Sequence, residues 1–426
     1  MPVQARRRGT SPHIVRPIYS VLDEVWINKQ LAQLRSHSCR YEHCLSYSSL
    51  AKVFSKSIGL YYPPNSLKTR LCLRGRQMLY TYCTEHGIPH RRLGKLVVGR
   101  DDQHKYIAAM HVKAQTLSAP PHWDHSTDPN VLPTEVLSGD AARERVPELA
   151  REITSSLWTP STGIIDSATL LSSLEKDIGD AGATIAYGTR VVRIDANPEH
   201  TRGWIVQTTT SSEEGSNGYA DAILARVLIN AAGLGAVSVL NEVLPLSQHI
   251  PLYYARGAYA AYRGPGVRGI KHLVYPADDA SAAKGASFHS LGTHLTLDME
   301  GNVRFGPDID WLSAPDGAVR DEDVWEAHLS TDEDRARSMY AAVSRYLPGV
   351  TPEGFRTDYV GIRPKLASPG APFQDFVIRT DYANKRDGEA PMISLLGIES
   401  PGLTASLALA EMVVEDMLVG TEKPSS

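Results

Sequence analysis

The sequence contains little cysteine, no long apolar run and no large excess of charge. It has only four cysteines in 426 residues, all in the first fifth of the chain, which argues against a disulfide framework and predicts reduced thiols. They are Cys39, Cys44, Cys72 and Cys83. No apolar stretch is long enough to cross a bilayer, so we expect no transmembrane segment.

The net charge of the chain is -4, which gives no basis for binding nucleic acid or another polyanion. Apolar residues make up 42% and charged residues 22%, proportions typical of globular proteins. A chain of 46.6 kDa can bury a large core, and its length suits two closely joined domains. The composition therefore favours a two-domain globular protein with no nucleic-acid partner.

The first 56 residues lack a strand, a G-x-G-x-x-G turn and a helix in succession, the unit that cradles a dinucleotide pyrophosphate. The chain has one literal match, GPGVRG at residues 264–269, but a strand-like stretch follows it where a helix is required. We interpret this match as a hairpin turn.

The N-terminal stretch contains Arg6, Arg7, Arg8 and Arg16 and no acidic residue before Asp23. An arginine-rich, acid-free start is typical of a mitochondrial transit peptide. The alternative is a disordered basic tail on a cytoplasmic protein, and the sequence favours the two about equally.

One histidine and cysteine cluster raises the question of a metal site. It consists of His37, Cys39, His43 and Cys44. Its spacing matches no standard zinc pattern, so we expect no metal.

The stretch at residues 397–418, GIESPGLTASLALAEMVVEDML, predicts a loop that turns at Gly397, Pro401 and Gly402. A helix should begin near Thr404, because apolar residues then recur at helical spacing. The first turn of a helix stabilises an anion through unpaired backbone N–H groups, and glycine lets that backbone approach closely. The alternative is a loop and helix that only pack.

The region 60–117 predicts a helix that begins near Asn65 or Ser66 and stops at Gly87, a buried strand at 94–99 and a second helix over 103–117. The first helix carries four basic residues away from its apolar positions, and we expect them to form a solvated face. They are Lys68, Arg70, Arg74 and Arg76.

The region 155–245 predicts a helix capped by Asp166 or Ser167, followed by strands over 183–194. A strand at 227–230, a small-residue turn at 231–235 and a helix at 236–244 come next. Such a turn lets the backbone approach a phosphate or a ring, although close packing of strand on helix explains it nearly as well.

Residues 250–312 alternate apolar and polar residues between turns, which predicts an antiparallel sheet with a hairpin at 300–302. A helical segment is expected after it, over 332–346. In HLTLDM the leucines share one face, and His294 shares the other with Thr296 and Asp298. His294 therefore points into solvent or into a cavity. A neutral histidine can accept a hydroxyl proton, so His294 is our candidate general base.

The stretch YVGIRPK places Arg363 on the strand face opposite Val360 and Ile362. An arginine binds a carboxylate through two parallel hydrogen bonds, and Lys365 offers a second positive charge for a distal carboxylate. Structural salt bridges are the alternative for both. Tyr253, Tyr254 and Arg256 are weaker candidates for the wall of the same cavity.

Five strings of this sequence, in order from about Gly59 to Leu418, resemble the L-2-hydroxyglutarate dehydrogenases. These flavoenzymes belong to the FAD-dependent superfamily of D-amino-acid oxidase. The strings are LYYPPNSLKTRLCL, GKLVVG, NAAG, LGTHLTLD with RFGP, and GIESPGLTASLA. The resemblance implies FAD as cofactor, oxidation of L-2-hydroxyglutarate to 2-oxoglutarate, a small-molecule 2-hydroxy acid as substrate and an unidentified electron acceptor.

The resemblance also implies an α/β fold. It comprises an FAD-binding, doubly wound (Rossmann-like) domain, here N-terminally incomplete, and an antiparallel β-sheet substrate domain. We assign 57–90, 155–245 and 360–420 to the first, 91–154 and 246–359 to the second, and 1–56 to an atypical segment. In the family, the C-terminal loop lies against the flavin, the residue at Val191 borders the adenine, and the histidine at position 294 lies in the active site. The cofactor-binding residues implied are Val191, Ala232, Gly233, Gly397, Ser400, Gly402, Leu403 and Thr404.

Two departures from the family pattern keep other functions open. The pyrophosphate-binding unit is missing, and Ser57 stands where the family has a histidine near the flavin. We therefore expect weak FAD binding or none. The alternatives are a relative that oxidises another hydroxy acid or an amine, and a truncated, non-catalytic paralogue that no longer binds FAD.

Overall fold

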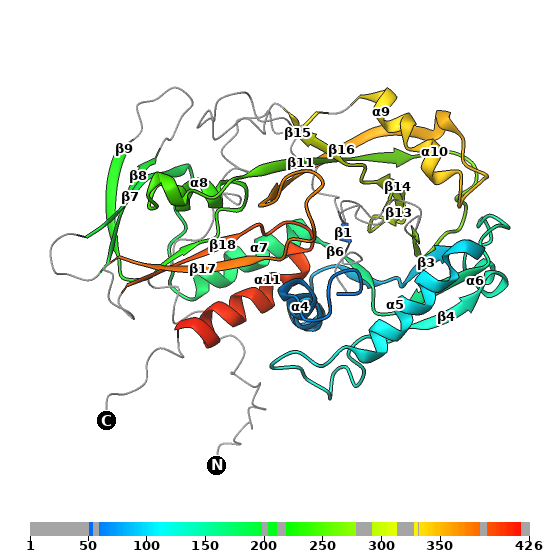
Figure 1. Cartoon of the computed structure of the whole chain (residues 1–426), viewed down its shortest axis with the longest axis horizontal. Coiled ribbons are helices and arrows are strands. Elements are labelled where there is room, and N and C mark those ends of the chain that lie inside the picture. The colour runs from blue at the N-terminus through cyan, green and yellow to red at the C-terminus, as the bar shows by residue number, and fades with distance from the viewer. Residues whose placement is uncertain are drawn as a thin grey trace, which may run out of the picture.

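The computed structural model describes residues 51–53, 59–197, 203–210, 219–277, 292–312, 328–330, 332–383 and 390–418 (Figure 1). The basic start, the cluster from His37 to Cys44, and Ser57 lie outside the described residues. Within the described ranges no helix combines the length and the apolar character needed to span a membrane. Cys72 and Cys83 are buried free thiols, as expected.

The largest element is a nine-stranded sheet with the order β15-β11-β14-β13-β12-β3-β5-β4, in which β16 also pairs with β11. Every pair is antiparallel except β12 with β3. The antiparallel sheet expected over 250–312 is therefore confirmed, and the strand expected at 94–99 joins it. The strands are β3 (Lys95–Gly99), β4 (Glu135–Ser138), β5 (Ser155–Thr159), β11 (Tyr253–Tyr262), β12 (Leu273–Pro276), β13 (His294–Leu297), β14 (Val303–Gly306), β15 (Asp310–Leu312) and β16 (Phe355–Lys365).

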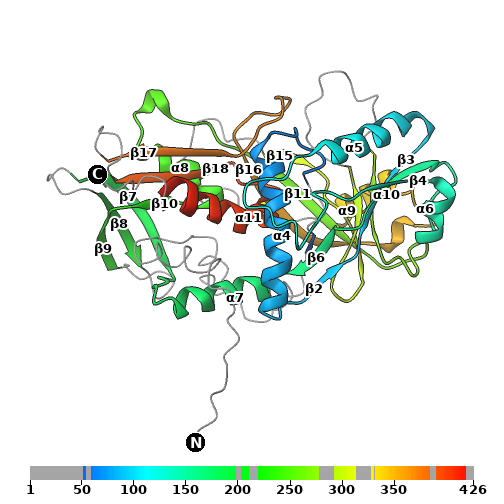
Figure 2. The ribbon, with the colours of Figure 1, turned by 90° about the horizontal axis from the view of Figure 1, so that it is seen from below.

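Three smaller sheets complete the strand pairing (Figure 2). In the first, β10 runs parallel to β18, and β17 is antiparallel to β18. The other two, β7-β8-β9 and β1-β6-β2, are antiparallel. The strands are β1 (Ala51–Val53), β2 (His90–Arg92), β6 (Gly163–Asp166), β7 (Thr189–Ala196), β8 (Trp204–Thr210), β9 (Tyr219–Ala225), β10 (Leu228–Asn230), β17 (Val377–Tyr382) and β18 (Pro391–Leu396).

Two of the helices begin where local capping signals predict. Ser66 accepts the Thr69 N–H at 3.1 Å at the start of α4, and Asp166 accepts two backbone N–H groups at the start of α7. The α/β class is therefore confirmed. The helices are α4 (Leu67–Glu85), α5 (His104–Thr116), α6 (Gly139–Arg145), α7 (Ser167–Asp180), α8 (Ala236–Asn241), α9 (Glu333–Ser338), α10 (Tyr340–Val343) and α11 (Gly402–Glu411), which continues as the π-helix η9 (Met412–Leu418). Short 3-10 turns are η4 (Asp101–Gln103), η5 (Gly233–Gly235), η6 (Leu246–Gln248) and η8 (Pro352–Gly354).

The two faces of the large sheet have different neighbours. Leu295, Phe305 and Ala260 point into an apolar cluster that also contains Val343 of α10. The opposite face carries His294 and, along β16, Arg363. The alternation read from HLTLDM therefore holds, and the leucines form the core side as predicted.

Three features differ from the sequence predictions. GPGVRG joins β11 to β12, which are separated in the sheet by β14 and β13, so it is a long-range connection and not a hairpin turn. Lys68, Arg74 and Arg76 are buried, so the prediction of a solvated basic face was wrong for them. Their partners come from distant parts of the chain. The proposed domain boundaries stay a prediction, although β5 pairs with β3 inside the large sheet.

Candidate active site

Two small-residue turns meet at one edge of the β10-β18 pair. Because the strands are parallel, with Asn230 opposite Ser394, the turns that follow them leave the sheet on the same side. The first turn contains Gly233 at φ 58° and the second Gly397 at φ 62°, a left-handed backbone that favours glycine. The structure thus brings together Ala232 and Gly233 with the loop from Gly397.

Asn230 holds the first turn in place. Its buried amide donates to Ala236 O at 2.8 Å and to Ser394 Oγ at 3.3 Å, and its carbonyl accepts the Ala232 N–H at 3.3 Å. The sequence analysis treated this residue only as the end of a strand. Its place at the head of NAAG was the available signal, since asparagine often fixes a turn through its side chain.

The second turn is fixed by two helices that cross closely, α4 and α11, seen side by side in Figures 1 and 2. A Cβ on Gly75 of α4 would lie 2.0 Å from the Thr404 carbonyl oxygen. The Tyr62 hydroxyl donates to Ser400 O at 3.4 Å. The helix begins at Gly402, two residues earlier than predicted, and Leu403 packs on the apolar cluster beneath it.

Val191 lies on β7, half-buried against the same apolar cluster as Ala232 and Leu366. The structure therefore groups Val191 with the turn after β10. Its predicted contact with an adenine stays a prediction.

The carboxylate of Glu399, in the loop before α11, is the electrostatic centre of the site. Its Oε1 accepts from Lys365 Nζ at 2.8 Å and from Lys68 Nζ at 3.0 Å, and the three side chains are at most 14% exposed. Burial disfavours the ionised carboxyl, but the positive charges of Lys68, Lys365 and Arg363 outweigh it and hold the pKa of Glu399 below its ordinary value.

Arg363 lies on the same face of β16 as Lys365 and next to the Glu399 loop. It pairs in register with Ala255 of β11, and its Nη2 would lie 3.4 Å from a Cβ placed on Gly257. Its charge also acts against the burial that raises the pKa of Tyr259 and of Tyr62. Within the described residues no hydrogen bond or ion pair holds the Arg363 guanidinium.

His294 is buried on β13, with its ring stacked on Tyr275 at 3.8 Å between ring centres. Its Nδ1 lies 3.0 Å from the Gly292 carbonyl oxygen. Because a carbonyl can only accept, Nδ1 carries the proton of the neutral ring and Nε2 carries the lone pair. This is the tautomer that a general base requires.

Tyr259 of β11 lies on the same sheet face as His294 and Arg363. His294 pairs with Gly306, and a Cβ on Gly306 would lie 2.9 Å from Tyr259 Cδ1. Alternation along β11 puts Tyr259 on the face of Ala255, the partner of Arg363. His294, Arg363, Lys365 and Tyr253 therefore share one face of the large sheet.

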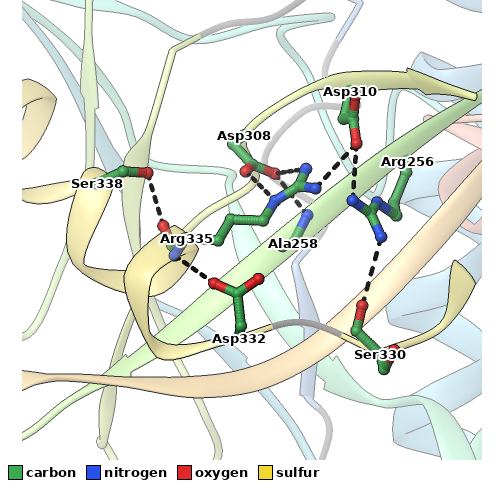
Figure 3. Close-up of polar contacts among 8 residues, drawn as sticks. All are labelled: Arg256, Ala258, Asp308, Asp310, Ser330, Asp332, Arg335 and Ser338. Carbon is green, nitrogen blue, oxygen red and sulfur yellow. Dashed lines mark hydrogen bonds and ion pairs between the residues drawn. The ribbon is translucent and has the colours of Figure 1, made fainter.

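Arg256 is not part of this group (Figure 3). It lies on the opposite face of β11, where it donates to Asp310 at 2.7 Å and to Ser330 O at 3.4 Å. Arg335 of α9 binds Asp310 and Asp308 beside it. The structure therefore places Arg256 in a network that ties α9 to the sheet.

A fully buried lysine adjoins the histidine stack and was missed in the sequence. Lys95 Nζ lies 5.0 Å from the ring centre of Tyr275 and 4.7 Å from that of Tyr61, and burial lowers its pKa well below the ordinary value. Glu399, Lys68 and Tyr259 were missed as well. Glu399 stands inside the string GIESPG, which was the available signal.

Comparison with known proteins identifies the family. A family model described as FAD dependent oxidoreductase matches residues 48–416. The mitochondrial L-2-hydroxyglutarate dehydrogenase of Arabidopsis thaliana is 32% identical over 385 residues, 84% of this chain and 73% of that protein. The chain belongs to the L-2-hydroxyglutarate dehydrogenase family of FAD-dependent oxidoreductases.

Other family members match less of the chain or at lower identity. The Escherichia coli K12 enzyme is 27% identical, and the alignment covers 58% of this chain and 51% of that enzyme. The mouse mitochondrial enzyme is 24% identical, covering 84% of this chain and 77% of its own. Among the bacterial L-2-hydroxyglutarate dehydrogenases, the chain thus spans about half of the relative's length.

Solved structures agree on the fold. An L-alpha-glycerophosphate oxidase from Mycoplasma pneumoniae, solved with FAD bound, aligns with a TM-score of 0.67 at 16% identity, covering 94% of this chain and 91% of its own. Glycine oxidase from Geobacillus kaustophilus aligns at 0.60 and 15% identity, covering 89% and 86%. The L-2-hydroxyglutarate dehydrogenase family resemblance and the FAD oxidoreductase fold are therefore confirmed, and FAD is the cofactor of this fold.

Proposed function

We propose that this chain oxidises L-2-hydroxyglutarate to 2-oxoglutarate with FAD as the hydride acceptor. One observation carries the proposal: an arginine and a histidine share a sheet face next to the two glycine turns at the edge of the β10-β18 pair. Tyr62 supports this placement, because its hydroxyl donates to the loop at Ser400 and the charge of Arg363 acts against the burial that raises the pKa of Tyr62.

The residues around the two turns fit the ring end of FAD. Gly233 and Gly397 have a left-handed backbone, and a Cβ on Gly397 would lie 3.0 Å from Leu366, so both turns favour glycine. Residues that would hold the cofactor are Ala232, Gly233, Gly397, Ser400, Gly402, Leu403 and Thr404. When bound, FAD supplies the redox chemistry by accepting a hydride from the substrate carbon.

Arg363 would bind the carboxylate next to the reacting carbon through two parallel hydrogen bonds. Lys365, two residues along the same face, would bind the distal carboxylate; side chains so spaced emerge about 6.6 Å apart. His294 Nε2 would accept the hydroxyl proton, and the bond to Gly292 holds its ring in the tautomer that can do so. Tyr253, opposite Lys365 in register, would line the wall.

The test is turnover by the purified chain supplied with excess FAD and an artificial electron-accepting dye. We expect dye reduction and 2-oxoglutarate formation with the L enantiomer of 2-hydroxyglutarate, and none with the D enantiomer. Glycerol 3-phosphate, glycine and other 2-hydroxy acids serve as the comparison panel. A preference for any of these, or no turnover with any substrate despite bound FAD, would overturn the proposal.

We also infer a mitochondrial location. The relatives from Arabidopsis thaliana, mouse and Bos taurus are named as mitochondrial, whereas other relatives are bacterial. Fractionation of cells that express the chain with a C-terminal tag tests the location, and recovery in the cytosolic fraction would contradict it.

A further inference from the structure

The site contains more positive than negative charge. Three cations, Lys68, Lys365 and Arg363, surround the carboxylate of Glu399. By formal charge, three cations thus face one carboxylate, and burial lowers the pKa of Lys365 below its ordinary value in spite of Glu399. Excess charge in a mostly buried group is unfavourable without a counter-ion, so the arrangement calls for an anionic ligand.

The three cations are not equally satisfied. Lys68 Nζ donates to Gln374 O at 2.9 Å as well as to Glu399, and three aromatic rings lie within 5.6 Å of it. Lys365 Nζ has Glu399 as its one hydrogen-bond partner within the described residues. Lys68 therefore anchors Glu399, whereas Lys365 depends on Glu399.

We propose that Glu399 is a specificity-determining residue that competes with the distal carboxylate of the substrate for Lys365. The inference rests on the proposed function. Without ligand, the Glu399 carboxylate satisfies the ammonium of Lys365. A dicarboxylate that binds Arg363 with one end brings its other end to Lys365, and its charge then meets the charge of Glu399.

The competition distinguishes two kinds of ligand. When a dicarboxylate binds, its distal carboxylate is repelled by the carboxylate of Glu399, which weakens binding. A monocarboxylate of the same length binds Arg363 and leaves the Lys365–Glu399 pair intact. Removing the charge of Glu399 while keeping its shape should therefore favour the dicarboxylate selectively.

The variant Glu399→Gln tests this, because its amide oxygen can still accept from both lysines. We expect it to bind 2-oxoglutarate about tenfold more tightly than the unmodified chain, since like charges near 4–6 Å in a partly buried site repel by more than the about 1.4 kcal/mol that this factor represents. Binding of 2-oxopentanoate, which lacks the distal carboxylate, should change about threefold or less. Titration calorimetry on the full chain with excess FAD measures both without turnover.

Glu411→Gln is the matched control. Glu411 lies on α11 and is similarly buried, but it binds Arg74 at 2.7 and 2.9 Å, away from Arg363. The substitution changes the net charge by the same amount. We expect it to alter binding of neither ligand. Equal gains in both Gln variants would reduce the effect to net charge and overturn the inference.

The outcomes separate the inference from the function. If the unmodified chain neither binds 2-oxoglutarate nor oxidises L-2-hydroxyglutarate, the proposed function fails. If it does both and Glu399→Gln binds 2-oxoglutarate equally or more weakly, only the inference fails, and Glu399 serves to position Lys365. Glu399→Ala covers the case in which Glu399→Gln does not fold. It also removes the charge of Glu399 and should favour 2-oxoglutarate over 2-oxopentanoate, and equal effects on the two ligands would overturn the inference.

Discussion

The crossing of α4 and α11 gives the most direct test of how the site is positioned. Gly75 lies where the two helices meet, and a Cβ there would come within 2.0 Å of the Thr404 carbonyl oxygen, 3.0 Å of its carbonyl carbon and 3.1 Å of Ala405 Cα. These are backbone atoms of a helix, which cannot rotate away as a side chain can. Gly75→Ala must therefore push the start of α11 outward.

The expected cost follows from two opposing effects. Overpacking a close contact costs about 1–3 kcal/mol, and a collision with rigid backbone belongs at the upper end of that range. Replacing glycine with alanine within a helix raises the free energy of unfolding by about 1 kcal/mol. We expect Gly75→Ala to lower the free energy of unfolding by about 2 kcal/mol in total. Because Ser400 lies just before α11 and Gly402 is its first residue, FAD content should fall too.

Gly179→Ala is the control for helix propensity. Gly179 is an exposed residue of α7, has an ordinary φ, and a Cβ there would meet no atom within 4 Å. This variant should gain about 0.5–1 kcal/mol. Urea unfolding and thermal scans of both variants, with bound FAD read from the absorbance spectrum, provide the comparison. If Gly75→Ala proves as stable as Gly179→Ala, the close crossing of the helices is incorrect.

Four further predictions concern the site. Arg363→Ala should raise KM for L-2-hydroxyglutarate by roughly 30-fold or more, because losing a carboxylate's charged partner costs about 2 kcal/mol or more, while FAD content stays constant; unchanged kinetics would remove Arg363 from the site. His294→Gln should lower kcat by about 100- to 10,000-fold and remove the acid limb of the pH–rate profile, and a retained limb would assign the base elsewhere. Because the pKa of Glu399 is lowered in the folded state, its ionised carboxylate stabilises the fold at pH values above the ordinary glutamate pKa of about 4.3, and this contribution is lost as pH falls through the folded pKa. The free energy of unfolding of Glu399→Gln should therefore fall less steeply with decreasing pH than that of the unmodified chain. Equal slopes of this free energy against pH in the two proteins would contradict the ion pairing. The purified chain should retain FAD weakly, because residues 1–56 lack a G-x-G-x-x-G turn, and a stoichiometric flavin spectrum without added FAD would contradict this.

Local signals in the sequence were enough to predict the elements that carry the site. The cap residues Ser66 and Asp166 act through backbone groups two or three residues away, so a short window contains all the information needed. The alternation in HLTLDM likewise depends only on neighbouring positions. For the same reason the face of His294 was predictable, whereas its stacking partner Tyr275 was not.

The burial of the basic residues on α4 could not be predicted from the helix itself. Lys68 pairs with Glu399, which is 331 residues away in sequence, and Arg74 pairs with Glu411, 337 residues away. Both partners belong to the loop and helix that cross α4. A helical window shows that a residue is charged and off the apolar stripe, but only the tertiary pairing shows that the opposite charge lies there.

For Tyr253 and Arg256, the alternation of side chains along a strand was a better guide to the site than residue type. They are three residues apart on one strand, so their side chains leave opposite faces, and at most one of them can face the site. The pairing of Ala255 with Arg363 then selects the face of Tyr253. The charge of Arg256 made it a candidate, but its position in the alternation places it with Asp310, on the side that anchors α9.

The charged side chains of the site come from three segments that lie far apart in the sequence. Lys68 comes from α4, Lys365 from β16 and Glu399 from the loop before α11, and their hydrogen bonds fix the three segments to one another. The same bonds leave Arg363 as the cation without a partner among the described residues. Binding of an anion at Arg363 is therefore coupled to the packing of α4 against α11, because any shift of the Glu399 loop changes the charge that this anion meets.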